Sequence, residues 1–491
     1  MNEEKIDTFT VKNKTKFGVI WNFVEKLSVQ FISFFISIIL ARQLTPYDYG
    51  VVGMFNVFLS YSNVLIESGF TRGLIQKKDV SDLDYSTIFF ANLIMSILVY
   101  IILFYFAPKI ANLYNIPEFI NLERVLFVNI ILNSLVIVQN ARLQKNIDFK
   151  TIALINFFSI LISGLIGIFA AYRGFGVWAI VVQSLMKGVV SMFLYWTLGR
   201  WMPKFVFSFS SFKNLFSYSS KLLIASIVGN TVDNIGSIVV GKIYNPTIMG
   251  YYTRARQFPE LTSGTVSSVL NNVTFPLMSS IQEDKEDLRH TFKKLVRLTA
   301  LVNIPAMLGL AILSKDIILV VLGEKWLPVT PLLFWIAVSY LLRPINSLNM
   351  NLLNAIGRSD LFLKVYLSKI PVQILFMIFT YPISIEAVVI GEALSAIIYF
   401  IMSAFLTGRL YAFGPLKQIK TITKYIISSG IMLLFLQLIK ILNISSLLTL
   451  LIGIFGGIFV YSVMLIILKD NEFKLIVNKF FKHNKRTLRY E

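Results

Sequence analysis

The chain has 491 residues, of which 56% are hydrophobic, and a mean hydropathy of +0.71. So large an apolar share leaves too few polar residues to cover a water-soluble globule of this length. The formal net charge is +20, but the basic residues are dispersed and no nucleic-acid-binding motif accompanies them, so no nucleic-acid partner is expected. The chain has no cysteine and only two histidines, and it lacks a Walker loop and a G-x-S-x-G motif. We therefore expect no cofactor, no metal site and no enzymatic activity.

Apolar runs long enough to cross about 30 Å of hydrocarbon predict an all-α polytopic membrane protein with about 14 transmembrane helices. In chain order the runs lie at residues 17–40, 48–69, 85–107, 119–139, 151–172, 176–198, 217–240, 248–280, 295–314, 328–353, 362–381, 384–406, 423–440 and 446–468. The eighth run is the least regular because Arg254, Arg256, Glu260 and Pro276 interrupt it.

Lysine and arginine accumulate in alternate connections between these runs. By the positive-inside rule this pattern places both termini in the cytoplasm, with the first helix as an uncleaved signal anchor. The excess of positive charge also predicts attraction to anionic lipid, most of all in the basic tail. Residues 282–297 are predicted to form a solvated charged turn, with partner binding as the alternative.

A stretch of thirteen residues occurs twice, as IILARQLTPYDYG at residues 38–50 and IVVGKIYNPTIMG at residues 238–250. The repeat predicts two halves of six helices each, and an even helix number makes the repeats parallel. The predicted parts are a cytoplasmic segment at 1–16, an N-lobe at 17–198, an interfacial linker at 199–216, a C-lobe at 217–406, two extra helices at 407–468 and a tail at 469–491.

Charged residues inside the predicted spans are expensive unless they face protein, water or a partner. The basic ones are Lys26, Lys187, Arg254, Arg256, Arg343 and Lys369, and the acidic ones are Glu25, Glu67, Asp233, Glu260 and Glu392. Lys369 is close enough to a helix end to snorkel, and Glu392 can be explained by a hydrogen bond between helices.

Polar residues at helical spacing form stripes on the first, second, seventh and eighth helices, at positions that match across the repeat. One interpretation is a water-filled central cavity lined by these four helices. The other is hydrogen bonding between helices, for which Ser and Asn are common residues. For Arg256 the corresponding alternative is an ion pair with Glu260.

Several segments resemble a known family: LARQLTPYDYGVVG and ESGFTRGLIQKK, the run MGYYTRARQFPELTSGTVSSVLNNVTFPLMSSIQED, then PAMLGLAILSKDIILVVLGEKW and LLNAIGRSDLFLK. Over residues 15–420 the chain is similar to the polysaccharide-transport branch, with its Wzx-type flippases, of the multidrug/oligosaccharidyl-lipid/polysaccharide exporter superfamily. The resemblance implies two six-helix lobes around a V-shaped cavity. It also implies an undecaprenyl-diphosphate-linked oligosaccharide as substrate, turned to the outer leaflet of a bacterial inner membrane, with polymerase machinery as a possible partner.

A diphosphate that crosses hydrocarbon needs basic side chains in place of its water. The predicted substrate-binding residues are Lys26, Arg254, Arg256, Arg343, Lys187, Asn22, Asn56 and Asn230. Arg343 is predicted to have Asn346, Ser347 and Asn354 as neighbours on its own face, with a kink at Pro344. The predicted ion-coupling residues are Asp233, Glu260 and Glu67, since the chain has no nucleotide motif to supply energy.

Three other classes of membrane protein fit the sequence less well. A major-facilitator transporter lacks support because its signature is missing after the second helix, from TRGLIQKKDVSDLDYS. A drug exporter of the same superfamily would need an acidic, aromatic cavity, whereas basic residues inside the predicted spans are at least as numerous as acidic ones. A membrane polysaccharide polymerase or ligase would need a large external loop. The exporter and the enzyme remain as alternatives.

Overall fold

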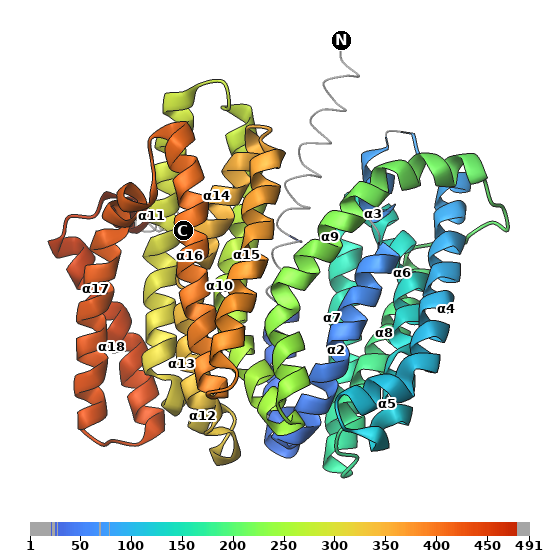
Figure 1. Ribbon diagram of the computed structural model, residues 1–491, viewed down its shortest axis with the longest axis horizontal. Helices are drawn as coiled ribbons and strands as arrows, with labels where there is room; N and C mark the ends of the chain where they lie inside the picture. Colours follow the sequence, from blue (N-terminus) through green and yellow to red (C-terminus); the bar gives the residue numbers. More distant parts are fainter. Residues whose placement is uncertain (1–20, 22–24, 27, 68–69, 78, 479–491) are drawn as a thin grey trace, which may run out of the picture. The chain divides into compact units, whose positions relative to one another are not determined.

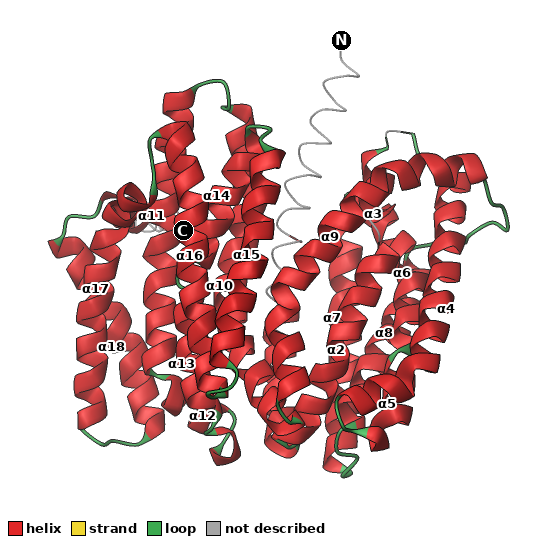
Figure 2. Ribbon diagram, in the orientation of Figure 1, coloured by secondary structure: helices red, strands yellow, loops and turns green. Residues whose placement is uncertain are grey.

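The structure is a computed structural model that describes residues 21, 25–26, 28–67, 70–77 and 79–478. Within these ranges every regular element is a helix, as Figure 2 shows, which confirms the all-α prediction. Contacts divide the chain into two compact units, Met1–Gly250 and Tyr251–Glu491.

The first unit begins, in its described part, with a helix over Ser28–Gln43 (Figure 1). It continues with α2 (Pro46–Glu67), α3 (Phe70–Gln76), α4 (Asp82–Leu113), η1 (Pro117–Phe119), α5 (Ile120–Leu126), α6 (Val128–Lys145), α7 (Phe149–Tyr172), α8 (Trp178–Leu198) and α9 (Phe209–Ile243). The first turn of α10 (Pro246–Ser280) closes this unit.

The second unit contains the rest of α10 and the later helices. These are α11 (Lys285–Ile312), α12 (Ser314–Val321), η2 (Glu324–Trp326), α13 (Val329–Ser339), α14 (Arg343–Ala355), α15 (Ser359–Thr380), α16 (Ile385–Tyr411), α17 (Pro415–Ile441) and α18 (Ser446–Ile467). Its hydrophobic core joins α11, α14, α16, α17 and α18 through side chains such as Phe292, Leu348, Phe400 and Tyr425.

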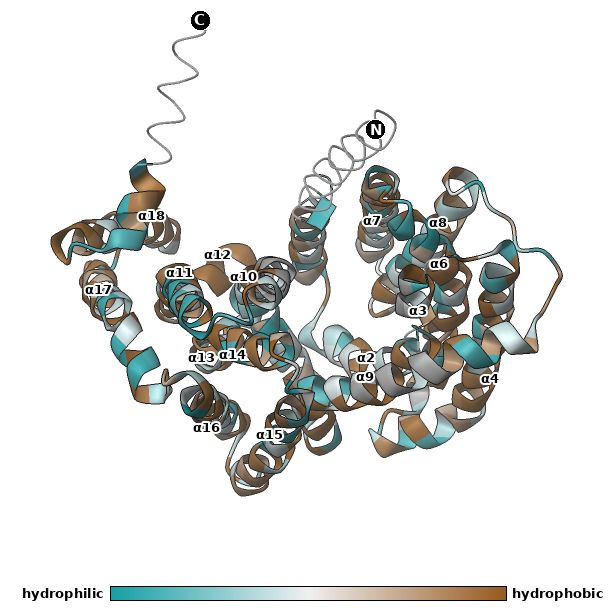
Figure 3. Cartoon of the chain, turned by 90° about the horizontal axis from the view of Figure 1, so that it is seen from above, coloured by the Kyte–Doolittle hydropathy of each residue, from teal (hydrophilic) through white to brown (hydrophobic). Residues whose placement is uncertain are grey.

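Eleven stretches of the described chain are long and apolar enough to cross a membrane. The helix over Ser28–Gln43 is shorter than a span, and α9 and α10 are not among the eleven stretches. The number fourteen therefore stays a prediction. Large apolar side chains such as Tyr105 on α4 and Phe455 on α18 are exposed, at 81% and 70%, as expected for surfaces that face lipid. Figure 3 shows hydrophobic residues along these helices.

Two predicted helices are broken in the structure. The run at 119–139 divides into α5 and α6 at Phe127, and the run at 328–353 divides into α13 and α14. Pro344 lies in the first turn of α14 and not in the middle of a helix. Asn303 of α11 donates hydrogen bonds to the carbonyls of Tyr340 (3.0 Å) and Leu341 (2.9 Å), which satisfies backbone groups that the break leaves open.

Two helix starts were predicted too late. The predicted charged turn at 282–297 is wrong, because α11 begins at Lys285 and the Asp284 side chain caps it by accepting from the amides of Glu286 and Asp287. Likewise α9 begins inside the predicted linker at 199–216, because the Ser208 side chain caps it.

The repeat forms two matching helix starts. Thr45 and Asp48 make reciprocal side-chain-to-backbone bonds before α2, at 2.8 and 3.3 Å, and the Asn245 side chain accepts from the amide of Ile248 before α10. Pro46 and Pro246 each open their helix. The two starts also touch, because a Cβ on Gly50 would overlap the Pro246 carbonyl and one on Gly250 would overlap the Pro46 carbonyl.

Candidate functional site

Charged and phenolic side chains meet between α10 and α16 in the second unit. The Tyr252 hydroxyl, fully buried, donates to Glu392 Oε1 at 2.6 Å, and Arg256 Nη1 donates to the Tyr252 hydroxyl at 3.3 Å. The prediction that Glu392 is hydrogen-bonded between helices is confirmed. Arg256 and Tyr252 lie one helical turn apart, so both reach α16 from one face of α10.

Tyr340, at the break between α13 and α14, extends this group. The Arg343 guanidinium lies 4.5 Å from the centre of the Tyr340 ring, and Tyr340 also interacts electrostatically with Arg256. Lys369 of α15 interacts electrostatically with Glu392, and its ammonium lies 5.4 Å from the centre of the Tyr399 ring. We call Tyr252, Arg256, Tyr340, Arg343, Lys369 and Glu392 the Arg256 cluster. It contains three cations and one carboxyl, and Glu260 also interacts with Arg256, so one positive charge remains in excess, which suits an anion.

Arg254 lies apart from this cluster. It is only 4% exposed, hydrogen-bonds Gln257, and lies with its guanidinium 5.7 Å from the Trp326 ring. Helix positions two apart differ by about 200° in direction, so Arg254 and Arg256 leave opposite sides of α10. Arg254 packs into the protein interior.

Polar residues of α2 and α9 pair mainly with each other. Asn230 Nδ2 donates to Ser60 Oγ at 3.2 Å, and the Tyr61 hydroxyl donates to Thr231 Oγ1 at 2.8 Å. Asn63 in turn accepts from Asn133 of α6 at 3.1 Å. These contacts favour helix–helix hydrogen bonding for Asn230.

Six other predicted site residues lie at exposed positions of their unit: Lys26, Asn56, Glu67, Lys187, Asp233 and Glu260. Glu260 also interacts electrostatically with Arg256, in line with the ion-pair alternative, although Tyr252 is the hydrogen-bonded neighbour. Glu25 accepts from Asn156 at 2.6 Å. Asn22 lies outside the described residues.

Sequence reasoning missed two tyrosines and a buried polar network. Tyr252 and Tyr340 are two of 21 tyrosines, and nothing in the sequence marks them. Asn346, predicted to share a face with Arg343, is buried and accepts from Ser403 of α16 at 3.3 Å. One turn later Asn349 bonds Gln418 of α17, and both contact Thr407. These buried amides join α14, α16 and α17 by hydrogen bonds.

The comparisons with known proteins agree on one family. The model of the family described as "Polysaccharide biosynthesis protein" matches residues 39–331. The teichuronic acid biosynthesis protein TuaB of Bacillus subtilis (strain 168) is 26% identical over 347 residues, which are 70% of this chain and 72% of that protein. The lipopolysaccharide biosynthesis protein WzxC of Escherichia coli (strain K12) is 24% identical over 420 residues, 85% and 81% of the two chains.

Two solved structures share the fold. The lipid II flippase MurJ in an inward closed conformation superposes with a TM-score of 0.71 at 18% identity, over 91% of this chain and 99% of that one. A multidrug-resistance MATE transporter in an inward-facing conformation gives a TM-score of 0.60 at 15% identity, over 80% and 96%. At these identities the likeness concerns the fold alone.

Proposed function

We infer the function from the premise that this chain belongs to the polysaccharide biosynthesis protein family, a membership that confirms the resemblance seen in its sequence. The chain is a membrane protein with many candidate spans, and its relatives are named for polysaccharide biosynthesis and transport. We propose that it is a flippase for lipid-linked sugars and not an enzyme. Its substrate in this proposal is an oligosaccharide on undecaprenyl diphosphate, moved from the cytoplasmic to the outer leaflet of a bacterial cell membrane.

The observation that supports this substrate is the Arg256 cluster. Arg256 and Lys369 interact electrostatically with Glu392, and Arg343 lies on Tyr340. Glu260 also interacts with Arg256, so three cations stand against two carboxyls among helices of a membrane protein. A diphosphate could replace part of its hydration with hydrogen bonds from the two guanidinium groups. A cation exporter, the alternative within the superfamily, would need the opposite balance of charge.

Flipping can be tested in proteoliposomes that contain a fluorescent undecaprenyl-diphosphate oligosaccharide. We expect the Arg343→Ala variant to slow flipping roughly tenfold or more, because one charge-assisted hydrogen bond contributes about 1.5–3 kcal/mol. Arg343→Lys should keep part of the rate. Uptake of a cationic dye in the same vesicles tests the exporter alternative. Dye transport without flipping would refute the proposal.

The proposed orientation has both termini in the cytoplasm. The chain has no cysteine, so single cysteines can report the side of each loop without background. Cysteines at the exposed positions Asn115 and Lys315 should react with an impermeant thiol reagent in intact cells, and one at the exposed Lys285 should react only after permeabilisation. The reverse labelling pattern would overturn the orientation.

Energy coupling through Asp233, Glu260 and Glu67 stays a proposal. Their side chains are exposed, as ion binding from an aqueous cavity requires, and Glu260 interacts with Arg256 of the proposed diphosphate site. An imposed proton or sodium gradient should accelerate flipping by the parent protein and leave the Glu260→Gln variant unaffected. An equal response of both proteins would remove Glu260 as the coupling residue.

A further inference from the structure

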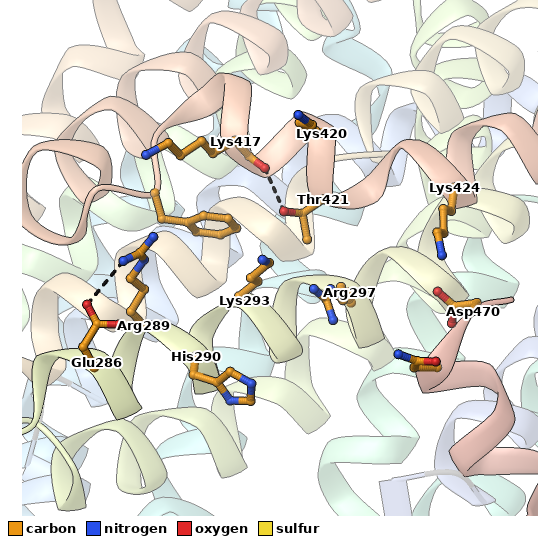
Figure 4. Close-up of a pocket in the computed structure, with 12 residues that line it drawn as sticks. Glu286, Arg289, His290, Lys293, Arg297, Lys417, Lys420, Thr421, Lys424 and Asp470 are labelled. Carbon is orange, nitrogen blue, oxygen red and sulfur yellow. Dashed lines mark hydrogen bonds and ion pairs between the residues drawn. The ribbon is translucent and has the colours of Figure 1, made fainter. Parts of the chain in front are cut away.

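A second basic site lies in the same unit, away from the Arg256 cluster. It is a pocket of about 560 Å³ between the first turns of α11 and α17 and the segment that follows α18. Six of its lining residues are cationic and two are acidic. Figure 4 shows Lys293 and Arg297 on one wall and Lys417 and Lys420 on the opposite one. The volume falls in the range of small-molecule sites.

Four of the six cations have roles within the protein. Arg289 pairs with Glu286 at 3.3 Å and Arg297 with Glu472 at 3.5 Å. Lys417 donates to the Ala412 carbonyl at 2.9 Å and Lys424 to the Leu468 carbonyl at 2.9 Å, so both hold carbonyls at helix ends. These contacts fix the walls of the pocket.

The remaining two cations, Lys293 and Lys420, have no hydrogen-bond or ion-pair partner within residues 79–478. They belong to neighbouring helices, α11 and α17, and Phe292 of α11 packs edge to face at 5.7 Å on Phe413, a lining residue in the connection before α17. Two like charges held across one pocket repel each other. An anion between them would turn this repulsion into two attractive contacts.

The pocket lies where three candidate spans have one end each. Both α11 and α17 begin there, and α18 ends there, so the pocket is at the membrane surface. Exposed aliphatic side chains lie close in sequence to the lining residues: Leu416 and Ile419 precede Lys417 and Lys420 on α17, at 84% and 42%, and Leu475 follows Asn471 after α18, at 52%. A basic pocket with an apolar border matches a ligand that has phosphates and acyl chains in one molecule.

We propose that this pocket binds an anionic phospholipid whose headgroup carries two phosphates, of the cardiolipin class. One phosphate lies near Lys293 and the other near Lys420, and the acyl chains run along Leu416 and Ile419 into the bilayer. The chain's own tail is a poor occupant, because residues 479–491 contain five Lys and Arg and a single acidic residue. The site is separate from the proposed substrate site.

Native mass spectrometry of the purified full-length protein tests the proposal with cardiolipin, phosphatidylcholine and inorganic pyrophosphate as probes. We expect the parent to prefer cardiolipin to phosphatidylcholine, and the Lys293→Gln/Lys420→Gln variant to bind cardiolipin roughly tenfold more weakly. The Lys213→Gln/Lys285→Gln variant removes the same charge from exposed positions outside the pocket and should bind like the parent. Lys293→Arg/Lys420→Arg should also retain binding.

Unchanged cardiolipin binding in the double glutamine variant would overturn the proposal. So would an equal loss in the control variant, since the effect would then reflect net charge alone. Pyrophosphate that binds with the same dependence on Lys293 and Lys420, while cardiolipin does not bind, would reassign the pocket to a soluble phosphate compound. None of these outcomes depends on flipping activity, so the result is distinguishable from a failure of the proposed function.

Discussion

The two copies of the repeat, α2 and α10, begin alike and then diverge. Each has a capping residue, a proline at its start and a glycine four positions later. The proline carbonyl of each copy lies directly against the glycine of the other copy. Beyond the first turns, α2 carries the neutral Asn56, Ser60 and Asn63. At the corresponding positions of α10 stand Arg256, Glu260 and Ser263.

This difference separates packing from chemistry. The part that the copies share is a backbone contact that only glycine permits, since any Cβ would overlap a carbonyl oxygen. The copies differ beyond this contact. Ser60 and Asn63 of α2 form hydrogen bonds with neighbouring helices, whereas Arg256 of α10 lies with Tyr252 and Glu392. The shared contact therefore belongs to the scaffold, and the charges of the proposed substrate site are specific to the second copy.

The largest effect is expected from exchanging the paired positions Asn56 and Arg256. Arg256→Ala should slow flipping of the lipid-linked oligosaccharide roughly tenfold to a hundredfold, because it removes a charge-assisted donor worth about 1.5–3 kcal/mol. Asn56→Ala should keep most of the parent rate, since its exposed side chain is neutral. Flipping in proteoliposomes at matched protein content measures both.

Arg256→Lys distinguishes charge from structure in this comparison. It keeps the cation and loses the planar donor geometry, so an intermediate rate is expected. A full rate for Arg256→Ala, or an equal loss for Asn56→Ala, would show that the two copies contribute alike and would remove the Arg256 cluster from the site.

A smaller and symmetric effect is expected at the glycines. Gly50→Ala and Gly250→Ala should each destabilise the protein by about 1–3 kcal/mol, because the added methyl group overlaps a backbone carbonyl that cannot rotate away. Gly430→Ala in the middle of α17 is the matched control, since no atom lies within 4 Å of its new Cβ. Thermal unfolding in detergent compares the three. A stable Gly250→Ala variant beside an unstable Gly50→Ala one would contradict the reciprocal contact.

The sequence predicted the helices well because membrane spans have strong apolar patterns. It could not predict the breaks at Phe127 and at Tyr340–Leu342, since the second is satisfied by a distant residue, Asn303. For the same reason it could not predict that Asn346 accepts a hydrogen bond from Ser403 of α16.

The candidate site was predictable only in part. Arg256 and Arg343 stood out because charge is rare in apolar segments, and they do come together around Tyr340. Arg254 stood out equally, yet it packs on Trp326, because helical phase and tertiary neighbours decide which way a side chain faces. Lys293 and Lys420 were hidden among many basic loop residues, and only the packing of α11 on α17 makes them face one pocket.

The smallest effect is expected for the neutral pair of the first unit, Ser60 and Asn230. Hydrogen bonds between membrane helices contribute on average about 0.6 kcal/mol, so Ser60→Ala, Asn230→Ala and the double variant should show a coupling energy near this value. Unfolding titrations of the four proteins in mixed micelles supply the double-mutant cycle. All variants should flip substrate at close to the parent rate, since Asn230 is occupied by Ser60 and Asn234. A tenfold loss of flipping in Asn230→Ala with unchanged stability would return Asn230 to the substrate path, and it would mean that this path includes α9 as well as the Arg256 cluster.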